Sequence, residues 1–190
     1  YLEKNARVYP NDVCLVEINP EIKEDRRVTW KEYELIEPSP KTSYRREITW
    51  SVFNEKANRF ANLLLQRGIK KGDKVAILMM NGLEWLPIYF GILKTGALAV
   101  PLNFRYSSDE IEYCVKLAEA DVLVFGPSFI GRVEEIADCI SKGRLLIYVG
   151  EGCPGFADDY NSLAANCSSQ SPAIPIFEDD DAAIYFSSGT

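Results

Sequence analysis

The 190-residue chain contains no histidine. Histidine is the base in Ser-His-Asp and Cys-His nucleophilic catalysis and a common zinc ligand, so this segment excludes those mechanisms and most zinc sites. An excess of basic residues is also lacking: 28 acidic residues outnumber 21 basic ones, and the formal net charge is −7. This balance argues against nucleic-acid binding, which needs a concentrated basic surface.

The five cysteines are odd in number and include no C-x-x-C pair. We therefore expect reduced thiols and a cytoplasmic protein rather than a disulfide framework. The N-terminus has no apolar run typical of a signal peptide. Residues 77–102 are the most apolar stretch, but Glu84, Pro87 and Lys94 lie within it. Its periodicity also changes twice, which predicts strand, helix and strand rather than a transmembrane segment.

The opening region, residues 1–47, differs in pattern from the rest. Residues 13–19 and 26–37 alternate in polarity and contain β-branched side chains, which predicts a hairpin. Residues 37–47 hold two prolines and mixed charges, which predicts a loop. This hairpin would either pack at the edge of the domain or form a subunit contact in a homodimer, and the sequence does not decide between these two roles.

From residue 48 onward, helical periodicity alternates with short apolar runs. Ser51 is the predicted cap of a first helix that Gly68 ends, and Gly96 closes a second helix over 83–95. Ser107 and Glu110 form an S-x-x-E capping box for a third. A fourth helix runs from Phe129 to Ile140, and strands are predicted at 74–80, 97–103, 121–125 and 144–149.

Four strand–helix alternations with short connections predict an α/β fold, a layered parallel-rich sheet with helices on both faces. Residues 150–177 are rich in Gly, Pro, Ser and Asn, and we expect a surface excursion with a short helix around 159–166. A last strand follows at 182–186. In such sheets the loops at the carboxyl ends of the strands bind ligands.

Two short motifs are interpreted as structural. "GEGCPG" (150–155) matches G-x-G-x-x-G, but no helix start follows it, and a Rossmann fingerprint needs one to hold the pyrophosphate. "EDDD" (178–181) places adjacent carboxylates on opposite sides of an extended chain, which favours a solvated turn over a metal site. We assign no metal ligands.

The last residues, "YFSSGT" (185–190), carry an apolar strand into hydroxyls and a glycine. Glycine lets the main chain approach an anion, and Ser and Thr hydroxyls add donors. The Walker pattern is absent, and a plain turn is the alternative.

Three segments in order resemble the adenylate-forming enzymes. "AIYFSSGT" (183–190) resembles the start of their phosphate-binding signature, Ser/Thr-Ser-Gly-Thr-Thr-Gly-x-Pro-Lys-Gly. "LKTGALAVPLN" (93–103) and residues 48–81 are similar to the family's upstream segments. Because the chain starts without Met and stops inside this signature, we expect it to be the N-terminal portion of a longer enzyme. Residues 48–190 would be the first α/β subdomain of the large AMP-binding domain.

The resemblance implies an ATP-dependent acid-thiol ligase of the acyl-CoA synthetase type, with a role in fatty acid metabolism. A carboxylate would attack the α-phosphate of ATP to give an acyl-adenylate, and coenzyme A would then take the acyl group. Ser187, Ser188, Gly189 and Thr190 would hold the ATP phosphates while Mg²⁺ spreads their charge, with Ser187 and Thr190 in direct contact. Catalytic residues would lie beyond Thr190, so this segment alone is expected to be inactive.

Arg105 lies in "NFRYSSDEIEYC" (103–114), which resembles a segment that in some acyl-CoA synthetases lies near the coenzyme A phosphates. A salt bridge within the loop is the equal alternative. The expected partners are a small carboxylate, ATP and coenzyme A, and neither the acid nor the oligomeric state follows from the sequence. The rival functions are an amino-acid-activating or luciferase-like enzyme, a non-catalytic α/β binding or assembly domain, and a redox enzyme built on "GEGCPG".

Overall fold

The structure of the chain is a computed structural model that describes residues 1–18, 45–140 and 143–187. The chain divides into two compact units, Tyr1–Phe53 and Asn54–Thr190. The domain boundary expected after residue 47 stays a prediction.

The first unit contains helix α1 (Leu2–Val8) and a two-stranded antiparallel sheet of β1 (Val13–Ile18) and β2 (Arg45–Thr49). The predicted strand at 13–19 is confirmed, whereas its expected partner, 26–37, lies outside the described residues. The loop predicted for 37–47 is wrong over Arg45–Glu47, which begins β2. Cross-strand charge pairing explains the difference: Arg46 lies opposite Glu17, and its guanidinium donates to the carboxylate at 2.7 Å.

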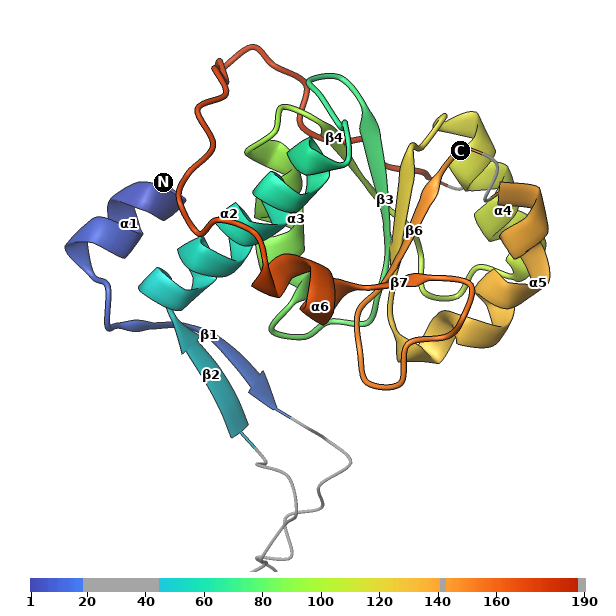
Figure 1. Ribbon diagram of the computed structural model, residues 1–190, viewed down its shortest axis with the longest axis horizontal. Coiled ribbons are helices and arrows are strands. Elements are labelled where there is room, and N and C mark those ends of the chain that lie inside the picture. The colour runs from blue at the N-terminus through green and yellow to red at the C-terminus, as the bar shows by residue number, and fades with distance from the viewer. Residues whose placement is uncertain (19–44, 141–142, 188–190) are drawn as a thin grey trace, which may run out of the picture. The chain divides into compact units, whose positions relative to one another are not determined.

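The second unit contains a parallel sheet of five strands in the order β4-β3-β5-β6-β7 (Figure 1). The strands are β3 (Lys74–Leu78), β4 (Leu98–Pro101), β5 (Val122–Phe125), β6 (Leu145–Tyr148) and β7 (Asp158–Asp159). The four strands predicted after residue 48 are therefore confirmed. The last predicted strand, 182–186, is reduced to one parallel bridge between Ala183 and Ala99 on β4.

Helices cover both faces of this sheet, as predicted. They are α2 (Trp50–Gln66), α3 (Trp85–Leu93), α4 (Ser108–Leu117), α5 (Ile130–Ile140) and α6 (Tyr160–Ala165), with a short 3-10 helix at Pro127–Phe129. Figure 1 shows α4 and α5 on one face and α2, α3 and α6 on the other.

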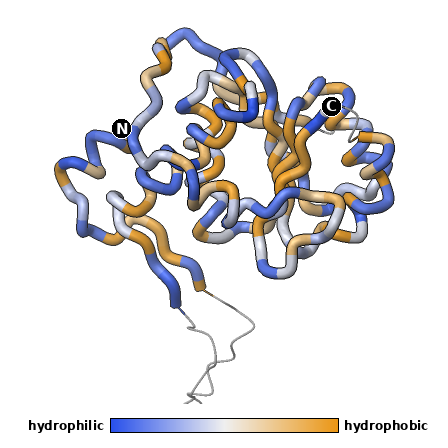
Figure 2. Tube along the Cα trace, in the orientation of Figure 1, coloured by the Kyte–Doolittle hydropathy of each residue, from blue (hydrophilic) through white to orange (hydrophobic). Residues whose placement is uncertain are grey.

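The core consists of two apolar clusters separated by the sheet. Ala76 and Leu78 of β3 pack with residues of α4 and α5, while Val75 and Ile77 pack with residues of α2, α3 and α6. Each of the four is at most 1% exposed. A parallel strand buried on both faces needs a continuous apolar run, and Figure 2 shows the central strands of the sheet mostly in the hydrophobic colour.

The start of α2 differs from the prediction by the position of its cap. The helix begins at Trp50, so Ser51 lies inside its first turn and is not the cap. The Thr49 hydroxyl instead accepts a hydrogen bond from the Val52 N–H at 3.4 Å. Both residues are good caps, and only the backbone decides which one lies at the boundary.

Two other predicted helix boundaries are confirmed. Gly68 has a φ of +86° after α2 and donates to the Leu65 carbonyl, while the Ile69 N–H donates to the Leu64 carbonyl. This is the Schellman arrangement that favours glycine. At α4, the Ser107 and Glu110 side chains form the reciprocal capping box.

Residues 150–177 are more ordered than the predicted surface excursion. They add β7 to the sheet edge and place α6 beside α2, and the α6 residues Tyr160 and Ala164 are buried. The chain after α6 is held by side chains of α2: Asn58 and Asn62 donate to the carbonyls of Ser169 and Ser168, each at 2.8 Å. These bonds satisfy backbone groups that no strand or helix pairs.

The five cysteines are free, and Cys114 is buried on α4, where its thiol packs as a small apolar residue. Within the described part of the chain, no helix is long and apolar enough to cross a membrane.

Gly91 marks the close crossing of α3 over α2. A Cβ atom there would lie 2.8 Å from the Ala57 carbonyl oxygen and 3.0 Å from the Phe60 ring. We expect Gly91→Ala to destabilise the protein by about 1–3 kcal/mol through overpacking. Thermal unfolding of the full-length protein measures the effect.

The matched control is Gly131→Ala on α5, where an added Cβ meets no atom within 4 Å. This change should be neutral or stabilise by up to about 1 kcal/mol, because alanine favours helix. Equal unfolding midpoints for the two variants would contradict the close crossing.

Candidate functional site

The predicted phosphate-binding residues follow the edge segment beside β4. Because the bridge between Ala183 and Ala99 is parallel, this segment runs toward the carboxyl edge of the sheet. Ser187 lies exposed beyond the bridge. Ser188, Gly189 and Thr190 lie outside the described residues, so the phosphate loop stays a prediction.

A pair of tyrosines links this segment to α3. The Tyr89 and Tyr185 hydroxyls lie 3.4 Å apart, and the Trp85 ring stacks on Tyr89 with centroids 5.4 Å apart. Burial raises the pKa of Tyr89 to about 12, and the hydrogen bond with Tyr185 adds to this. Tyr89 is therefore a neutral phenol at physiological pH, and it contacts the segment two residues before Ser187.

Arg105 lies exposed in the loop between β4 and α4, which also begins at the carboxyl edge of the sheet. Its backbone N–H donates to the Asn103 side-chain oxygen at 3.0 Å, and its guanidinium lies 5.3 Å from the centre of the Phe104 ring. Within residues 1–18, 45–140 and 143–187, no acidic side chain lies within ion-pair distance of it. The loop salt bridge considered above is therefore not formed with any described residue.

Arg132 of α5 holds the loop that carries Arg105. Its guanidinium donates to the carbonyls of Phe104 at 2.9 Å and Tyr106 at 2.7 Å, on either side of Arg105. It also lies 4.8 Å from the centre of the Phe129 ring. Nothing in the sequence distinguishes Arg132 from other charged residues on the polar face of a helix, because its partners are backbone carbonyls of another element.

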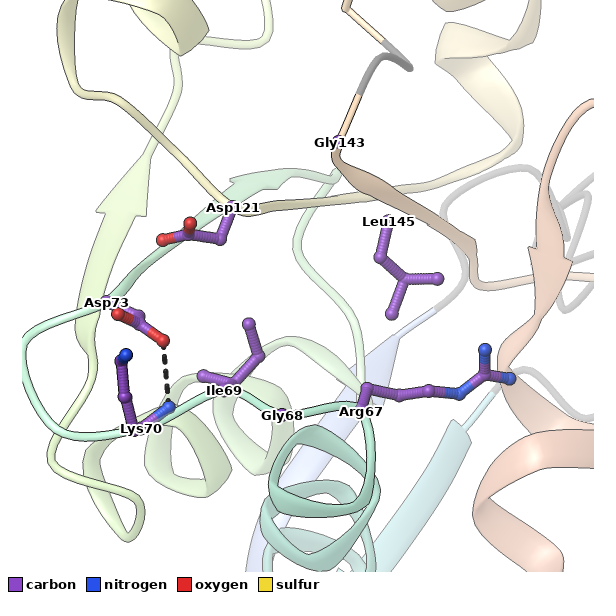
Figure 3. A pocket seen from close by; sticks show the side chains of 8 residues that line it. All are labelled: Arg67, Gly68, Ile69, Lys70, Asp73, Asp121, Gly143 and Leu145. Atoms are coloured by element: carbon purple, nitrogen blue, oxygen red, sulfur yellow. Dashed lines mark hydrogen bonds between the residues drawn. The ribbon is translucent and has the colours of Figure 1, made fainter.

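A pocket of about 340 Å³ lies at the opposite, amino edge of the sheet (Figure 3). Asp73 and Asp121 line it just before β3 and β5, and their carboxylates accept the N–H groups of Lys70 and Lys74. Arg67 forms an ion pair with Asp158 at 3.6 Å. These charged groups hold turns and connections together, so we assign the pocket no ligand.

The two motifs interpreted as structural have structural roles. No helix opens across "GEGCPG", and Gly150 packs so tightly that a Cβ there would lie 2.6 Å from the Tyr148 hydroxyl oxygen. In "EDDD", the Asp180 carboxylate accepts the Phe177 N–H at 2.8 Å and the Lys71 ammonium at 2.6 Å. Both contacts lower the pKa of Asp180, the Lys71 contact most.

Comparison with known protein families places the chain among the AMP-binding enzymes. The family model described as "AMP-binding enzyme" matches residues 38–190. The chain therefore belongs to this family, and the resemblance to adenylate-forming enzymes is confirmed.

Curated relatives of the chain are CoA ligases. A long-chain-fatty-acid–CoA ligase of Mycobacterium tuberculosis is 31% identical over 138 residues, which is 72% of this chain and 26% of that protein. A crotonobetaine/carnitine–CoA ligase of Escherichia coli is 35% identical over 143 residues, 72% of this chain and 27% of that protein. The chain thus matches about a quarter of the length of these relatives.

Solved structures agree on the fold. An anthranilate CoA ligase in complex with anthranoyl-AMP superposes with a TM-score of 0.80 at 25% identity, covering 99% of this chain and 31% of that one. A fatty acyl CoA synthetase of Mycobacterium tuberculosis superposes with a TM-score of 0.74 at 24% identity, covering 98% and 32%. The predicted α/β fold class is confirmed.

The role of Arg132 gives a test of the loop that carries Arg105. In Arg132→Met, the carbonyls of Phe104 and Tyr106 lose their shared donor, so backbone amides of 103–107 should exchange hydrogen faster. Hydrogen exchange of the full-length protein followed by mass spectrometry measures the change.

Arg144→Met is the matched control, because Arg144 also donates to a carbonyl, that of Ala120 at 2.7 Å, and not to the 103–106 loop. It should leave exchange at 103–107 unchanged. Unaltered exchange there in Arg132→Met would contradict the assigned role.

Proposed function

We propose that the chain is the N-terminal part of an acyl-CoA synthetase, which activates a carboxylic acid with ATP and transfers the acyl group to coenzyme A. The observation that carries the proposal is that residues 183–187, the described start of "AIYFSSGT", follow a parallel bridge to β4 toward the carboxyl edge of the sheet, in a chain of the AMP-binding family. The names of the relatives support the same class, because they are ligases of coenzyme A.

The first half-reaction joins a carboxylate oxygen to the α-phosphorus of ATP and breaks the bond to the β-phosphate oxygen, releasing pyrophosphate. Charge accumulates on the leaving pyrophosphate, so donors fixed around it lower the barrier. The hydroxyls of Ser187, Ser188 and Thr190 and the backbone at Gly189 are the donors in this proposal. In the second half-reaction a coenzyme A thiol replaces AMP on the acyl carbon.

Mg²⁺ enters this proposal as the counter-ion of the ATP phosphates. The described residues contain no cluster of three or more Cys, Asp or Glu side chains that could hold a metal ion, and histidine is absent. We therefore assign no metal ligand among the described residues.

The carboxylic acid substrate, the cellular compartment and the oligomeric state are further parts of this proposal. The acids named for the relatives differ, from long-chain fatty acids to crotonobetaine or carnitine, so a role in fatty acid metabolism is one branch of the proposal. Free thiols are compatible with a reducing cytoplasm. For the opening region, edge packing and subunit contact in a homodimer both stay open.

The phosphate-loop assignment predicts a loss of adenylate formation. In the full-length enzyme, Ser187→Ala and Thr190→Val should each lower kcat for carboxylate-dependent ATP–pyrophosphate exchange by roughly 10²-fold, the usual cost of losing one donor to developing charge. Ser169→Ala is the matched control, because this exposed serine lies after α6 and contributes only its carbonyl to a hydrogen bond with Asn58. Exchange rates equal to the wild type in both loop variants would contradict the assignment.

Arg105 is proposed to contact a phosphate of coenzyme A. Arg105→Ala should raise KM for coenzyme A by about 10- to 100-fold through loss of a charge-assisted hydrogen bond, while ATP–pyrophosphate exchange stays unchanged. Steady-state kinetics of thioester formation measure the split between the two half-reactions. A parallel loss of both half-reactions would point to a structural role for Arg105 instead.

The rival adenylate-forming functions differ in the acceptor. An amino-acid-activating or luciferase-like enzyme would form an adenylate whose consumption does not accelerate when coenzyme A is added. A thioester product that depends on coenzyme A supports the synthetase.

A further inference from the structure

The segment that leads to Ser187 is attached to the sheet by very little backbone pairing. The Ala99 N–H donates to the Ala182 carbonyl at 3.0 Å, and the Ile184 N–H donates to the Ala99 carbonyl at 2.9 Å. A slip of one residue in such a pairing turns every later side chain to the opposite face. Two hydrogen bonds alone define this register weakly, so side-chain contacts must complete it. Ala183 packs against one core cluster, and Ile184 and Phe186 pack against the other.

Three side chains hold the chain just before this pairing. The Lys71 ammonium donates to the Asp180 carboxylate at 2.6 Å and lies 5.0 Å from the centre of the Phe177 ring. The same carboxylate accepts the Phe177 N–H at 2.8 Å, which closes a turn over 177–180. We call Lys71, Phe177 and Asp180 the Lys71 clasp.

The turn that carries Lys71 is itself fixed to the start of β4. The Gly72 N–H donates to the Gly96 carbonyl at 2.9 Å, and the Leu98 N–H donates to the Asp73 carbonyl at 2.8 Å. The Lys71 side chain lies across Gly96, since a Cβ on that glycine would come 2.9 Å from Lys71 Cγ. The clasp therefore holds Asp180 at the amino end of β4, and Ala99 pairs with the chain only two residues after Asp180.

This ion pair differs from the surface pairs within single helices. Lys116 and Glu112 pair along α4, and Arg59 and Glu55 pair along α2. Each of these pairs joins two residues that the backbone of one helix already holds in place. Lys71 and Asp180 are 109 residues apart, and the acceptor also closes a turn. An exposed ion pair adds little to global stability, but this one joins the turn before β3 to the chain that pairs with β4.

We propose that the Lys71 clasp, together with this packing, sets the register of residues 182–187 against β4 and thereby directs the side chain of Ser187, where the proposed phosphate loop begins. Lys71 and Asp180 are then positioning residues for ATP, acting from the amino edge of the sheet through the edge segment. An extended residue advances the chain by about 3.3 Å, so the two-residue spacing between Asp180 and Ala182 leaves little slack between clasp and pairing. The proposal rests on the proposed function, because it takes Ser187 to begin a phosphate loop.

The test uses Lys71→Met and Asp180→Asn in the full-length enzyme. Both remove the ion pair, while the asparagine side chain of Asp180→Asn keeps an oxygen that can accept the Phe177 N–H. KM for MgATP in ATP–pyrophosphate exchange should rise roughly fivefold or more, and KM for the carboxylate should stay unchanged. The double variant should lose no more than either single variant, since both remove one interaction.

Two controls separate positioning from loss of surface charge or of fold. Lys116→Met removes a lysine from a helical ion pair on α4 and should leave KM for MgATP unchanged. Lys71→Arg keeps a cation near both Asp180 and Phe177 and should restore values close to the wild type. A KM for MgATP in Lys71→Met equal to that in Lys116→Met would overturn the proposal, even if the unfolding midpoint falls.

Hydrogen exchange gives a second readout that does not depend on activity. The Ile184 amide should exchange faster in Lys71→Met and not in Lys116→Met, because loss of the clasp frees the pairing with Ala99. If the wild-type enzyme shows no carboxylate-dependent exchange of ATP and pyrophosphate, the proposed function is wrong, and exchange at Ile184 still tests the clasp. Unchanged exchange at Ile184 would overturn the register argument.

Discussion

The burial of β3 on both faces is the constraint on which the rest of the second unit depends. Val75 and Ile77 face one apolar cluster, and Ala76 and Leu78 face the other, all at most 1% exposed. A strand buried in this way must have parallel neighbours joined by helices that cover both sides. Parallel strands bring their carboxyl ends to one edge, which is where both Arg105 and the chain leading to Ser187 emerge.

Residues 182–187, which lead to the proposed phosphate loop, are attached to the sheet differently from its interior strands. The interior strands pair over several residues, whereas residues 182–187 pair only through Ala99. Side chains supply the remaining attachment: Ala183, Ile184 and Phe186 pack against the core clusters. Lys71 contacts the chain before the pairing and Tyr89 contacts it after the pairing. Segments with few backbone hydrogen bonds belong to the less stable parts of a fold.

Membership in the AMP-binding family says more about the function of the protein than the fold alone does. Doubly wound sheets of this kind serve many unrelated functions. The chain matches about a quarter of the length of its curated relatives, so the proposed activity is that of a longer protein. Arg132 holds the two carbonyls that flank Arg105, so the place of the proposed coenzyme A contact depends on a residue from another element.

By itself, the sequence determined the order of strands and helices after residue 48, the capping box at Ser107 and the glycine stop at Gly68. These depend on local periodicity and on backbone preferences of single residues. It also indicated the family, through three segments in order at 48–81, 93–103 and 183–190, and the family model that matches residues 38–190 confirms this. Only the tertiary structure decided that Thr49 rather than Ser51 caps α2, that Arg45–Glu47 form a strand, and that Asp180 holds Lys71. Each of these depends on a partner distant in sequence or on the backbone path, because equivalent capping or charged residues compete and packing alone selects among them.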